Sequence, residues 1–326
     1  MTDLSNNGLS GTVAVNGDKS GIINLNLSNN NFSGSLSFLN GMTYIQKIDV
    51  SDNQFSGSIS GLGGFSVIKQ FIANNNQLTG SLSSALAGST TLGVLNVANN
   101  NLSGTAPTLS QNMDTYDISN NSFTGDIGLI ASANGSQVFS YLNIAGNTGI
   151  TGDLASIKHD ANGFAISFGG TGVKFDANKL AALKVSSVSY DGSVGTKLTD
   201  ADVTGLDTIS TLTALNLANN NLTKIPTLPQ SQQMVTVNLA GNKIAAISQA
   251  DGSNLQAALG GIGTNVINLA HNQIASTVPS ALTAKGPVNL TDQSVATLDP
   301  SLIKRVGDKI TIKLSDVNAY AGQDGY

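Results

Sequence analysis

The sequence predicts an α/β solenoid, a right-handed superhelix of short turns with a long parallel β-sheet on its concave face and irregular or short helical segments on its convex side. A twelve-residue motif at 25–36 (LNLSNNNFSGSL) returns at 48–59 (IDVSDNQFSGSI) and at 95–106 (LNVANNNLSGTA). A fixed period of this kind is typical of stacked repeats that bury one continuous core. Charged residues make up 11% of the chain, against about 25% in ordinary domains. The surface is therefore expected to consist mainly of Asn, Ser, Thr and Gly.

One asparagine in each turn sets the register, three residues past a short apolar strand. Two degenerate turns are expected in the long gap between Asn147 and Asn220, the first with Thr171 in the asparagine position and the second, Val188–Ser193, fitting poorly. Gln293 continues the series, so we expect ten asparagine turns and three degenerate ones. The asparagine positions are Asn7, Asn30, Asn53, Asn76, Asn100, Asn121, Asn147, Asn220, Asn242 and Asn272.

Each position in the motif has a physical reason. Alternation along a strand turns Leu25 and Leu27 inward and Asn26 outward. The amide of Asn30 turns the chain and is expected to bond backbone groups of neighbouring turns, which gives a stacked asparagine ladder. Gly34 permits a tight bend, after which apolar residue 36 returns to the core.

The pattern L-x-x-L-x-L-x-x-N-x-L resembles that of leucine-rich repeat proteins over nearly the whole chain. Residues 1–151 carry the additional [LF]-[ST]-G-x-[LI] tail of plant-type repeats, whereas residues 203–298 resemble the shorter repeats of bacterial internalin-like surface proteins. Between them, residues 152–202 are interpreted as degenerate repeats that form a junction and locally alter the curvature. Residues 299–326 are predicted to be a C-terminal cap and tail.

The two ends of the chain lead to further expectations. Pro300–Val306 is predicted to be a short helix or turn, and Lys309–Leu314 a terminal edge strand whose basic residues block further strand addition. Because Met1 begins within a repeat, we interpret the chain as part of a longer, exported protein. The absence of cysteine-bearing caps favours a microbial origin.

The outward position between the two core residues of each strand is the candidate binding surface. It is mostly Asn or Asp, with Ile72 and Ser167 among the exceptions, and Tyr141 is the aromatic residue placed on the same face. Asn or Asp is common at this position in the family, so plain solvation of the surface is an alternative interpretation. The predicted binding residues are Asn26, Asp49, Asn96, Asp117, Tyr141, Asn143, Asn216, Asn238 and Asn268.

Hydroxyl side chains form a second array in the N-terminal half. One column comprises Ser10, Ser33, Ser56, Thr79, Ser103, Thr124 and Thr151, and a second comprises Thr12, Ser35, Ser58, Ser81 and Thr105. Stacked strands would space equivalent hydroxyls by about 4.8 Å. Such an array resembles the flat Ser/Thr surfaces of ice-binding solenoids, which makes an antifreeze function an alternative.

Several functions are disfavoured. The net charge of −5 offers no basic stripe for nucleic acid. Without cysteine there is neither a disulfide framework nor a thiolate metal site, no transmembrane run is found, and no cofactor is implied. An enzyme is not expected, because His159 and His271 are too far apart to share a site and are interpreted as solvated turn or loop residues.

The sequence therefore predicts a non-catalytic binding or adhesion module of a secreted or surface protein, extracellular and of microbial origin. Its partner is expected to be a protein or a glycan held on the concave Asn/Asp face. The alternatives are the ice-binding protein already described and a structural spacer that self-associates into filaments.

Overall fold

A computed structural model describes residues 2–131, 139–159, 163–261, 266–276, 278–283, 286–294, 303–306 and 309–312. The chain divides into two compact units. Unit 1 comprises residues 1–174 and 194–196, and unit 2 comprises residues 175–193 and 197–326. The border between the units falls within the segment predicted to be a junction, whose effect on curvature stays a prediction.

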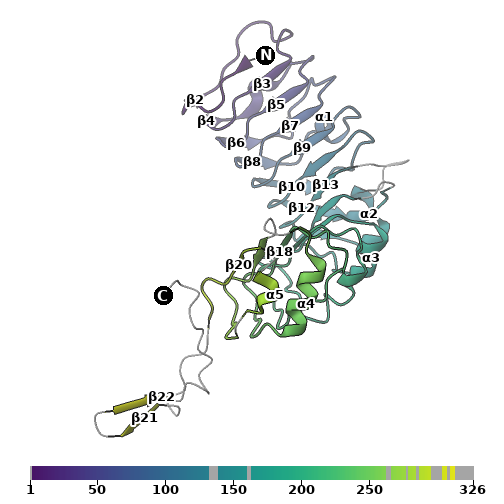
Figure 1. The fold of residues 1–326 in the computed structure, drawn as a ribbon. Helices are drawn as coiled ribbons and strands as arrows, with labels where there is room; N and C mark the ends of the chain where they lie inside the picture. The colour runs from purple at the N-terminus through teal and green to yellow at the C-terminus, as the bar shows by residue number, and fades with distance from the viewer. Residues whose placement is uncertain are drawn as a thin grey trace. The chain divides into compact units, whose positions relative to one another are not determined.

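The main sheet of unit 1 is parallel, and its strands follow one another in sequence order (Figure 1). Leu25, Ile48, Phe71, Leu95 and Tyr116 are register partners along it and are all buried, so each turn adds one apolar residue to a continuous core. The strands are β1 (Thr2–Asp3), β3 (Asn24–Asn26), β5 (Lys47–Asp49), β7 (Gln70–Ile72), β9 (Val94–Asn96), β11 (Thr115–Asp117), β13 (Tyr141–Asn143) and β15 (Ala165–Ser167).

Unit 2 continues the same type of repeat with five parallel main strands. They are β16 (Ser187–Ser189), β17 (Ala214–Asn216), β18 (Thr236–Asn238), β19 (Val266–Asn268) and β20 (Val288–Asn289). The poorly fitting turn around Val188 forms a strand, because Val188 occupies the core position opposite Leu215. Across the described residues the main strands thus correspond to the thirteen turns that the sequence predicts.

A second parallel sheet lies on the side of unit 1, and each of its strands is shifted by two residues relative to the preceding turn. Thr12 pairs with Ser33, and Ser58 pairs with Thr79, so residues at equivalent positions do not face one another. Strand geometry then places equivalent hydroxyls about 8 Å apart, and the expected spacing of about 4.8 Å is wrong. The strands are β2 (Ser10–Thr12), β4 (Asn31–Gly34), β6 (Gln54–Ser58), β8 (Gln77–Gly80), β10 (Asn101–Thr105), β12 (Ser122–Asp126) and β14 (Gly149–Thr151).

Short helices return the chain on the side away from the main sheet. Polar side chains cap several of them: Asp176 accepts a hydrogen bond from the Lys179 amide at 3.1 Å, and Ser248 forms a reciprocal capping box with Asp251. The helices are the 3₁₀ segments η1 (Leu36–Leu39), η2 (Leu154–Ser156) and η3 (Leu206–Thr208), and α1 (Ser84–Ala87), α2 (Ile127–Ile130), α3 (Ala177–Ala182), α4 (Gln249–Ala258) and α5 (Ser280–Thr283).

The C-terminal segment differs from the prediction. Ile303–Val306 and Lys309–Ile312 form an antiparallel pair, β21 and β22, so the helix or turn predicted for Pro300–Val306 is wrong over 303–306. The β-branched residues in both segments favour the extended backbone. The other residues from 299 onward, which include the rest of the predicted cap and tail, lie outside the described part of the chain.

Candidate functional site: the exposed face of the main sheets

The ladder asparagines join each turn to the turn before it. The Asn100 Oδ1 accepts a hydrogen bond from the Leu78 amide at 2.9 Å. Its Nδ2 donates to the carbonyl of Ala73 at 3.0 Å in the preceding turn, and to those of Val97 and Ala98 at 3.1 and 3.2 Å in its own. The same arrangement recurs at Asn30, Asn53, Asn76, Asn121, Asn147, Asn220, Asn242 and Asn272, and Asn7 forms the part of it that lies within the first turn.

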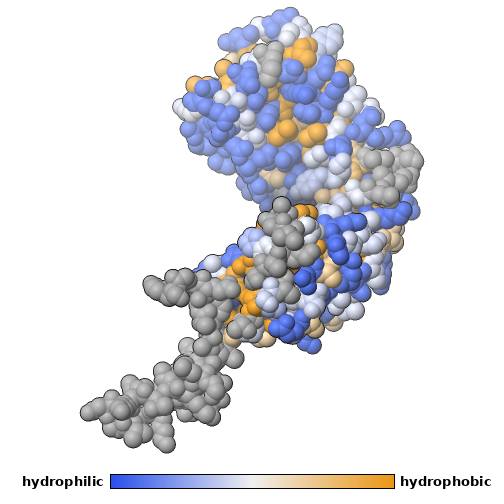
Figure 2. All heavy atoms as spheres, in the orientation of Figure 1, coloured by the Kyte–Doolittle hydropathy of each residue, from blue (hydrophilic) through white to orange (hydrophobic). Residues whose placement is uncertain are grey.

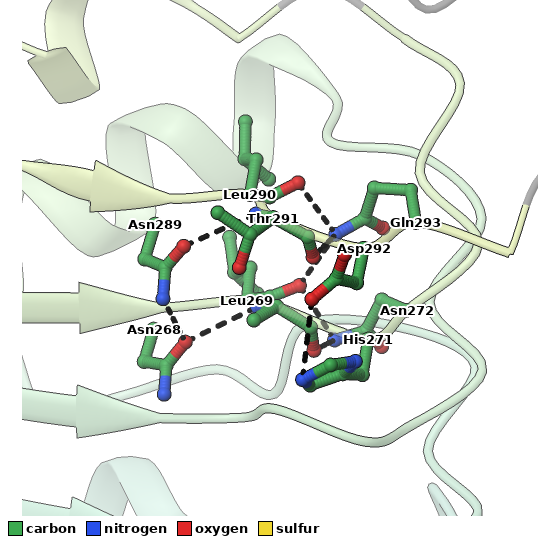
Figure 3. A network of polar contacts seen from close by, with 10 residues as sticks. Asn268, Leu269, His271, Asn272, Asn289, Leu290, Thr291, Asp292 and Gln293 are labelled. Carbon is green, nitrogen blue, oxygen red and sulfur yellow. Dashed lines mark hydrogen bonds and ion pairs between the residues drawn. The ribbon is translucent and has the colours of Figure 1, made fainter. Parts of the chain in front are cut away.

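The degenerate turns replace the asparagine to different extents. Gln293 reproduces both halves of the arrangement. Its Nε2 donates to the Leu269 carbonyl at 2.9 Å (Figure 3), and its Oε1 accepts from the Ile274 amide at 2.9 Å. The hydroxyl of Thr171 is shorter and stays within its own turn, where it donates to the Phe168 carbonyl at 2.7 Å. The ladder is thus a structural element that satisfies buried backbone groups.

The residue before each ladder asparagine adopts a left-handed conformation, which the sequence reasoning missed. Asn99 has φ 56° and His271 has φ 53°. Asn and Asp tolerate this conformation because their short polar side chains bond locally, which explains why paired asparagines recur in the motif. In unit 1 these exposed amides also bond to one another, as Asn120 Nδ2 does to Asn99 Oδ1 at 2.7 Å.

Most oxygens of the exposed Asn/Asp column are already engaged by the protein backbone. The Asp49 Oδ1 accepts hydrogen bonds from the amide of Ser51 at 3.0 Å and from its hydroxyl at 2.6 Å. This bond to the amide two residues on ends the strand in an Asx turn. It recurs at Asp3, Asn26, Asn96, Asp117, Asn143, Asn216, Asn238, Asn268 and Asn289. A large part of the column's polarity therefore supports the fold and is not free for a ligand.

Tyr141 belongs to a network that is satisfied within unit 1. The Asn143 Nδ2 donates to the Tyr141 hydroxyl oxygen at 3.0 Å and to the Asp117 Oδ2 at 3.1 Å. Burial and the neighbouring Asp117 carboxylate raise the pKa of Tyr141, so its hydroxyl stays protonated at neutral pH. The structure brings these three predicted binding residues together, with few of their polar atoms left for a partner.

The predicted binding residues of unit 2 lie in a plain polar row. Asn289 Nδ2 donates to Asn268 Oδ1 at 3.1 Å, and the neighbouring His271 lies 3.8 Å from Asp292 with both side chains largely exposed (Figure 3). Asn216 donates to the Ser189 hydroxyl at 3.0 Å, and Asn238 bonds the Ala240 amide. Solvation and strand termination account for this row.

Ile72 interrupts the polar column in unit 1. It lies on β7 between Asp49 and Asn96, which are its register neighbours, and it cannot form the Asx bond of the other turns. A hollow of about 270 Å³ opens beside it, lined by Asn24, Leu25, Asn26, Lys47, Ile48, Asp49, Gln70 and Ile72. Figure 2 shows apolar atoms between hydrophilic side chains over β3, β5 and β7.

A second hollow of about 650 Å³ adjoins the first and shares Lys47 and Gln70 with it. It extends along the edge where the strands begin, and its lining comprises Gln46, Lys47, Lys69, Gln70, Thr91, Gly93, Val94, Asn112 and Asp114. Gly93 allows the turns to approach closely at this edge, because a Cβ there would lie 3.2 Å from the Asn112 carbonyl oxygen. We call the two together the paired hollow.

Most of the lining of the paired hollow was missed by the sequence reasoning. Asn26 and Asp49 were predicted, whereas Lys47, Lys69 and Gln70 were not considered. The one available signal was Ile72, an apolar residue in an otherwise polar column, which is the kind of local exception that often marks a functional position.

His159 is not the solvated loop residue that the sequence suggested. Its ring lies between Phe139 and Phe164, with centroids 4.6 and 4.4 Å away, and its Nε2 is 2.9 Å from the Phe139 carbonyl oxygen. It is half-buried and packs against these two aromatic rings. Among the described residues no group of three or more His, Cys, Asp or Glu side chains is arranged to hold a metal ion. No helix in the described ranges is both long and apolar enough to span a membrane.

Comparisons with known proteins agree with this architecture. The family model of the Leucine Rich Repeat matches residues 211–231. A search of curated protein sequences found no match. The chain therefore has the leucine-rich repeat fold, both by its repeats and by the solved structures that it resembles.

Three of these structures illustrate the two repeat styles. One is the plant peptide hormone receptor RGFR1 in complex with RGF2, with TM-score 0.54 and 19% identity over 90% of this chain and 51% of that one. The Arabidopsis receptor kinase HAESA, in complex with the peptide hormone IDA and the co-receptor SERK1, gives TM-score 0.52 and 22% identity over 93% and 50%. An internalin from Listeria monocytogenes gives TM-score 0.53 and 17% identity over 84% and 88%. The chain spans about half the length of the plant receptors.

Proposed function

We propose that the chain is a non-catalytic, extracellular binding module that holds a segment of a protein partner on the exposed main sheet of unit 1, over β3 to β9. The paired hollow is the observation that supports this proposal. It combines a recessed surface, a half-buried aliphatic residue at Ile72 and two lysines. On the rest of this face most polar atoms are already hydrogen-bonded within the protein.

A protein segment fits this surface better than a glycan does. Sugar rings are commonly held by stacking on aromatic side chains together with free hydrogen-bonding groups, and no aromatic residue lines either hollow. The carboxamide and carboxylate oxygens that would accept from sugar hydroxyls are partly occupied by the Asx bonds. An extended peptide instead presents aliphatic and charged side chains, which match the lining.

The structural likenesses support the proposal at the level of the fold. Two of the similar structures are plant receptors in complex with peptide hormones, so this type of repeat is able to present a peptide-binding surface. The likeness of this chain to extracellular repeat domains also supports an extracellular or cell-surface location for it. Labelling of intact cells of the source with a membrane-impermeant reagent would test that location, and protection of the chain from the reagent would contradict it.

Selection of peptides from a random dodecapeptide display library against the whole chain tests the binding function. Ile72→Asn introduces the asparagine that most other turns have at this position and removes the apolar side chain from the hollow. Ser167→Asn introduces the same residue at the equivalent position on β15, away from the hollow, and serves as the control. We expect enriched peptides to bind the wild type and Ser167→Asn equally and to bind Ile72→Asn about tenfold more weakly, a difference of about 1.4 kcal/mol. Failure to enrich any peptide, or enriched peptides that bind all three proteins equally, would refute the proposal.

A further inference from the structure

We propose that the partner segment is an acidic peptide that places a carboxylate between Lys47 and Lys69 and an aliphatic side chain on Ile72. This inference rests on the proposed function and specifies the chemistry of its ligand. It follows from the charges, the register and the packing around the paired hollow.

The two lysines are close to each other and have no acidic partner. The Lys69 amide donates to the Gln46 carbonyl at 2.8 Å, which places Lys69 directly beside the residue that precedes Lys47. Gln70 is the register partner of Lys47, and Lys69 immediately precedes Gln70, so the two cations lie diagonally to each other where β5 and β7 begin. Neither lysine forms an ion pair with any residue in the described part of the chain. In a protein of net charge −5, two unpaired exposed cations in one hollow form a local site for an anion.

Acidic residues lie at the opposite ends of the paired hollow. The Asp49 Oδ1 is held by Ser51, and the Asp114 Oδ1 accepts from the Ser140 hydroxyl at 2.6 Å while its Oδ2 accepts from Thr115 at 3.1 Å. Because like charges repel, these carboxylates disfavour a ligand carboxylate at either end. The arrangement therefore favours one acidic side chain at the centre, between the lysines.

The apolar part of the lining sets where an aliphatic side chain would lie. Ile72 is two residues from Gln70 along β7, which corresponds to about 7 Å of extended strand. An extended peptide covers a similar distance in two residues. The ligand is thus expected to carry Asp or Glu within about two residues of Leu, Ile or Val, with the Gln70 amide between the two contacts.

The presence of Ile72 in a column that is mostly Asn or Asp supports a binding role for this position. Asn or Asp there would form the Asx bond to the amide of residue 74 that ten other turns form at the corresponding position. Ile72 forgoes this hydrogen bond and exposes part of an aliphatic side chain. A local loss of stability of this kind is common where a surface is adapted to a partner.

The same display selection, analysed by peptide composition, tests the inference. Peptides that depend on Ile72 are expected to be enriched in Asp or Glu near an aliphatic residue. They should bind the double variant Lys47→Glu/Lys69→Glu at least about tenfold more weakly, and their affinity for the wild type should fall with added salt. Lys158→Glu/Lys174→Glu is the matched control, since it changes the net charge equally outside the hollow, and it should leave binding unchanged.

Selection against the double variant itself provides the complementary measurement. If the lysines read the charge of the ligand, the variant is expected to enrich peptides with Lys or Arg in the place of the acid. Peptides that depend on Ile72 but show no preference for acidic residues would overturn this inference and leave the proposed function intact. Absence of any Ile72-dependent peptide would refute both.

Discussion

Asn99, Asn100 and Asn101 are three consecutive asparagines with different structural roles. We therefore predict a different loss of stability when each is replaced by alanine. Asn100 is buried and forms four hydrogen bonds that join two turns. Asn99 adopts φ 56° and bridges two exposed neighbours, donating to Asn75 at 2.7 Å and accepting from Asn120 at 2.7 Å. Asn101 begins β10 with an exposed side chain.

The magnitudes follow from these contacts. A net contribution of about 1 kcal/mol per hydrogen bond, over the four bonds of Asn100, gives a loss of about 4 kcal/mol for Asn100→Ala, since the Leu78 amide is left buried without a partner. Asn99→Ala should cost about 1–2 kcal/mol, because alanine is strained in the left-handed region. Asn99→Gly relieves that strain and should cost less. Asn101→Ala should change the stability by less than about 0.5 kcal/mol.

Urea unfolding followed by circular dichroism measures these differences, and the midpoint is the safest comparison because repeat proteins do not always unfold in a single step. Hydrogen exchange at the Leu78 and Leu102 amides adds a local measurement, since the first bonds to Asn100 and the second to Asn121. Equal losses for Asn100→Ala and Asn101→Ala would refute the assignment of the ladder as the element that holds the turns together.

Three further predictions follow. Ile72→Asn should stabilise the chain by about 0.5–1.5 kcal/mol through its new Asx bond while it weakens peptide binding, and a lower urea midpoint would contradict this. Burial raises the pKa of Tyr116, whose hydroxyl donates to the Pro107 carbonyl at 2.8 Å. Above about pH 10 the unfolded chain loses this proton while the folded chain keeps it, so the stability is full below pH 10 and falls as the pH rises. Tyr116→Phe should therefore be less stable than the wild type at pH 8, by about 1 kcal/mol. Between pH 8 and pH 11 the variant should lose less stability than the wild type does. Equal losses for the two proteins over this range would count against this explanation. Finally, we expect no thermal hysteresis, because equivalent hydroxyls of the side sheet are staggered and the Ser58 hydroxyl at the end of β6 already donates to Ser60 Oγ at 3.1 Å. Measurable hysteresis in the wild type would refute this.

The repeat pattern was informative about the fold because each of its positions answers a local requirement. The alternation around Leu25, the amide of Asn30 and the slot taken by Gln293 each follow from backbone geometry within one or two turns. The local sequence pattern gave a wrong prediction at the C-terminal end, where Ile303–Val306 pairs with a following strand instead of forming a helix or turn. It also failed for His159, which packs against Phe139 from 20 residues earlier in the chain as well as against the nearby Phe164.

The candidate site could be predicted only in part. The exposed Asn/Asp column was found from its spacing, but the engagement of residues such as Asp49 and Asn143 by nearby amides and hydroxyls requires the positions of the atoms. The proximity of Lys47 to Lys69 depends on the pairing of β5 with β7, and the second hollow is lined by residues of four successive turns, from Gln46 to Asp114.

By itself, the sequence determined the leucine-rich repeat solenoid, its thirteen turns and the residues that face inward or outward, because the strand and turn periods are properties of the local backbone. Only the tertiary structure decided the two-residue stagger of the side sheet, which polar atoms remain free and where a recess opens beside Ile72. These features depend on how each turn is placed against the next, and a single repeat does not contain that information.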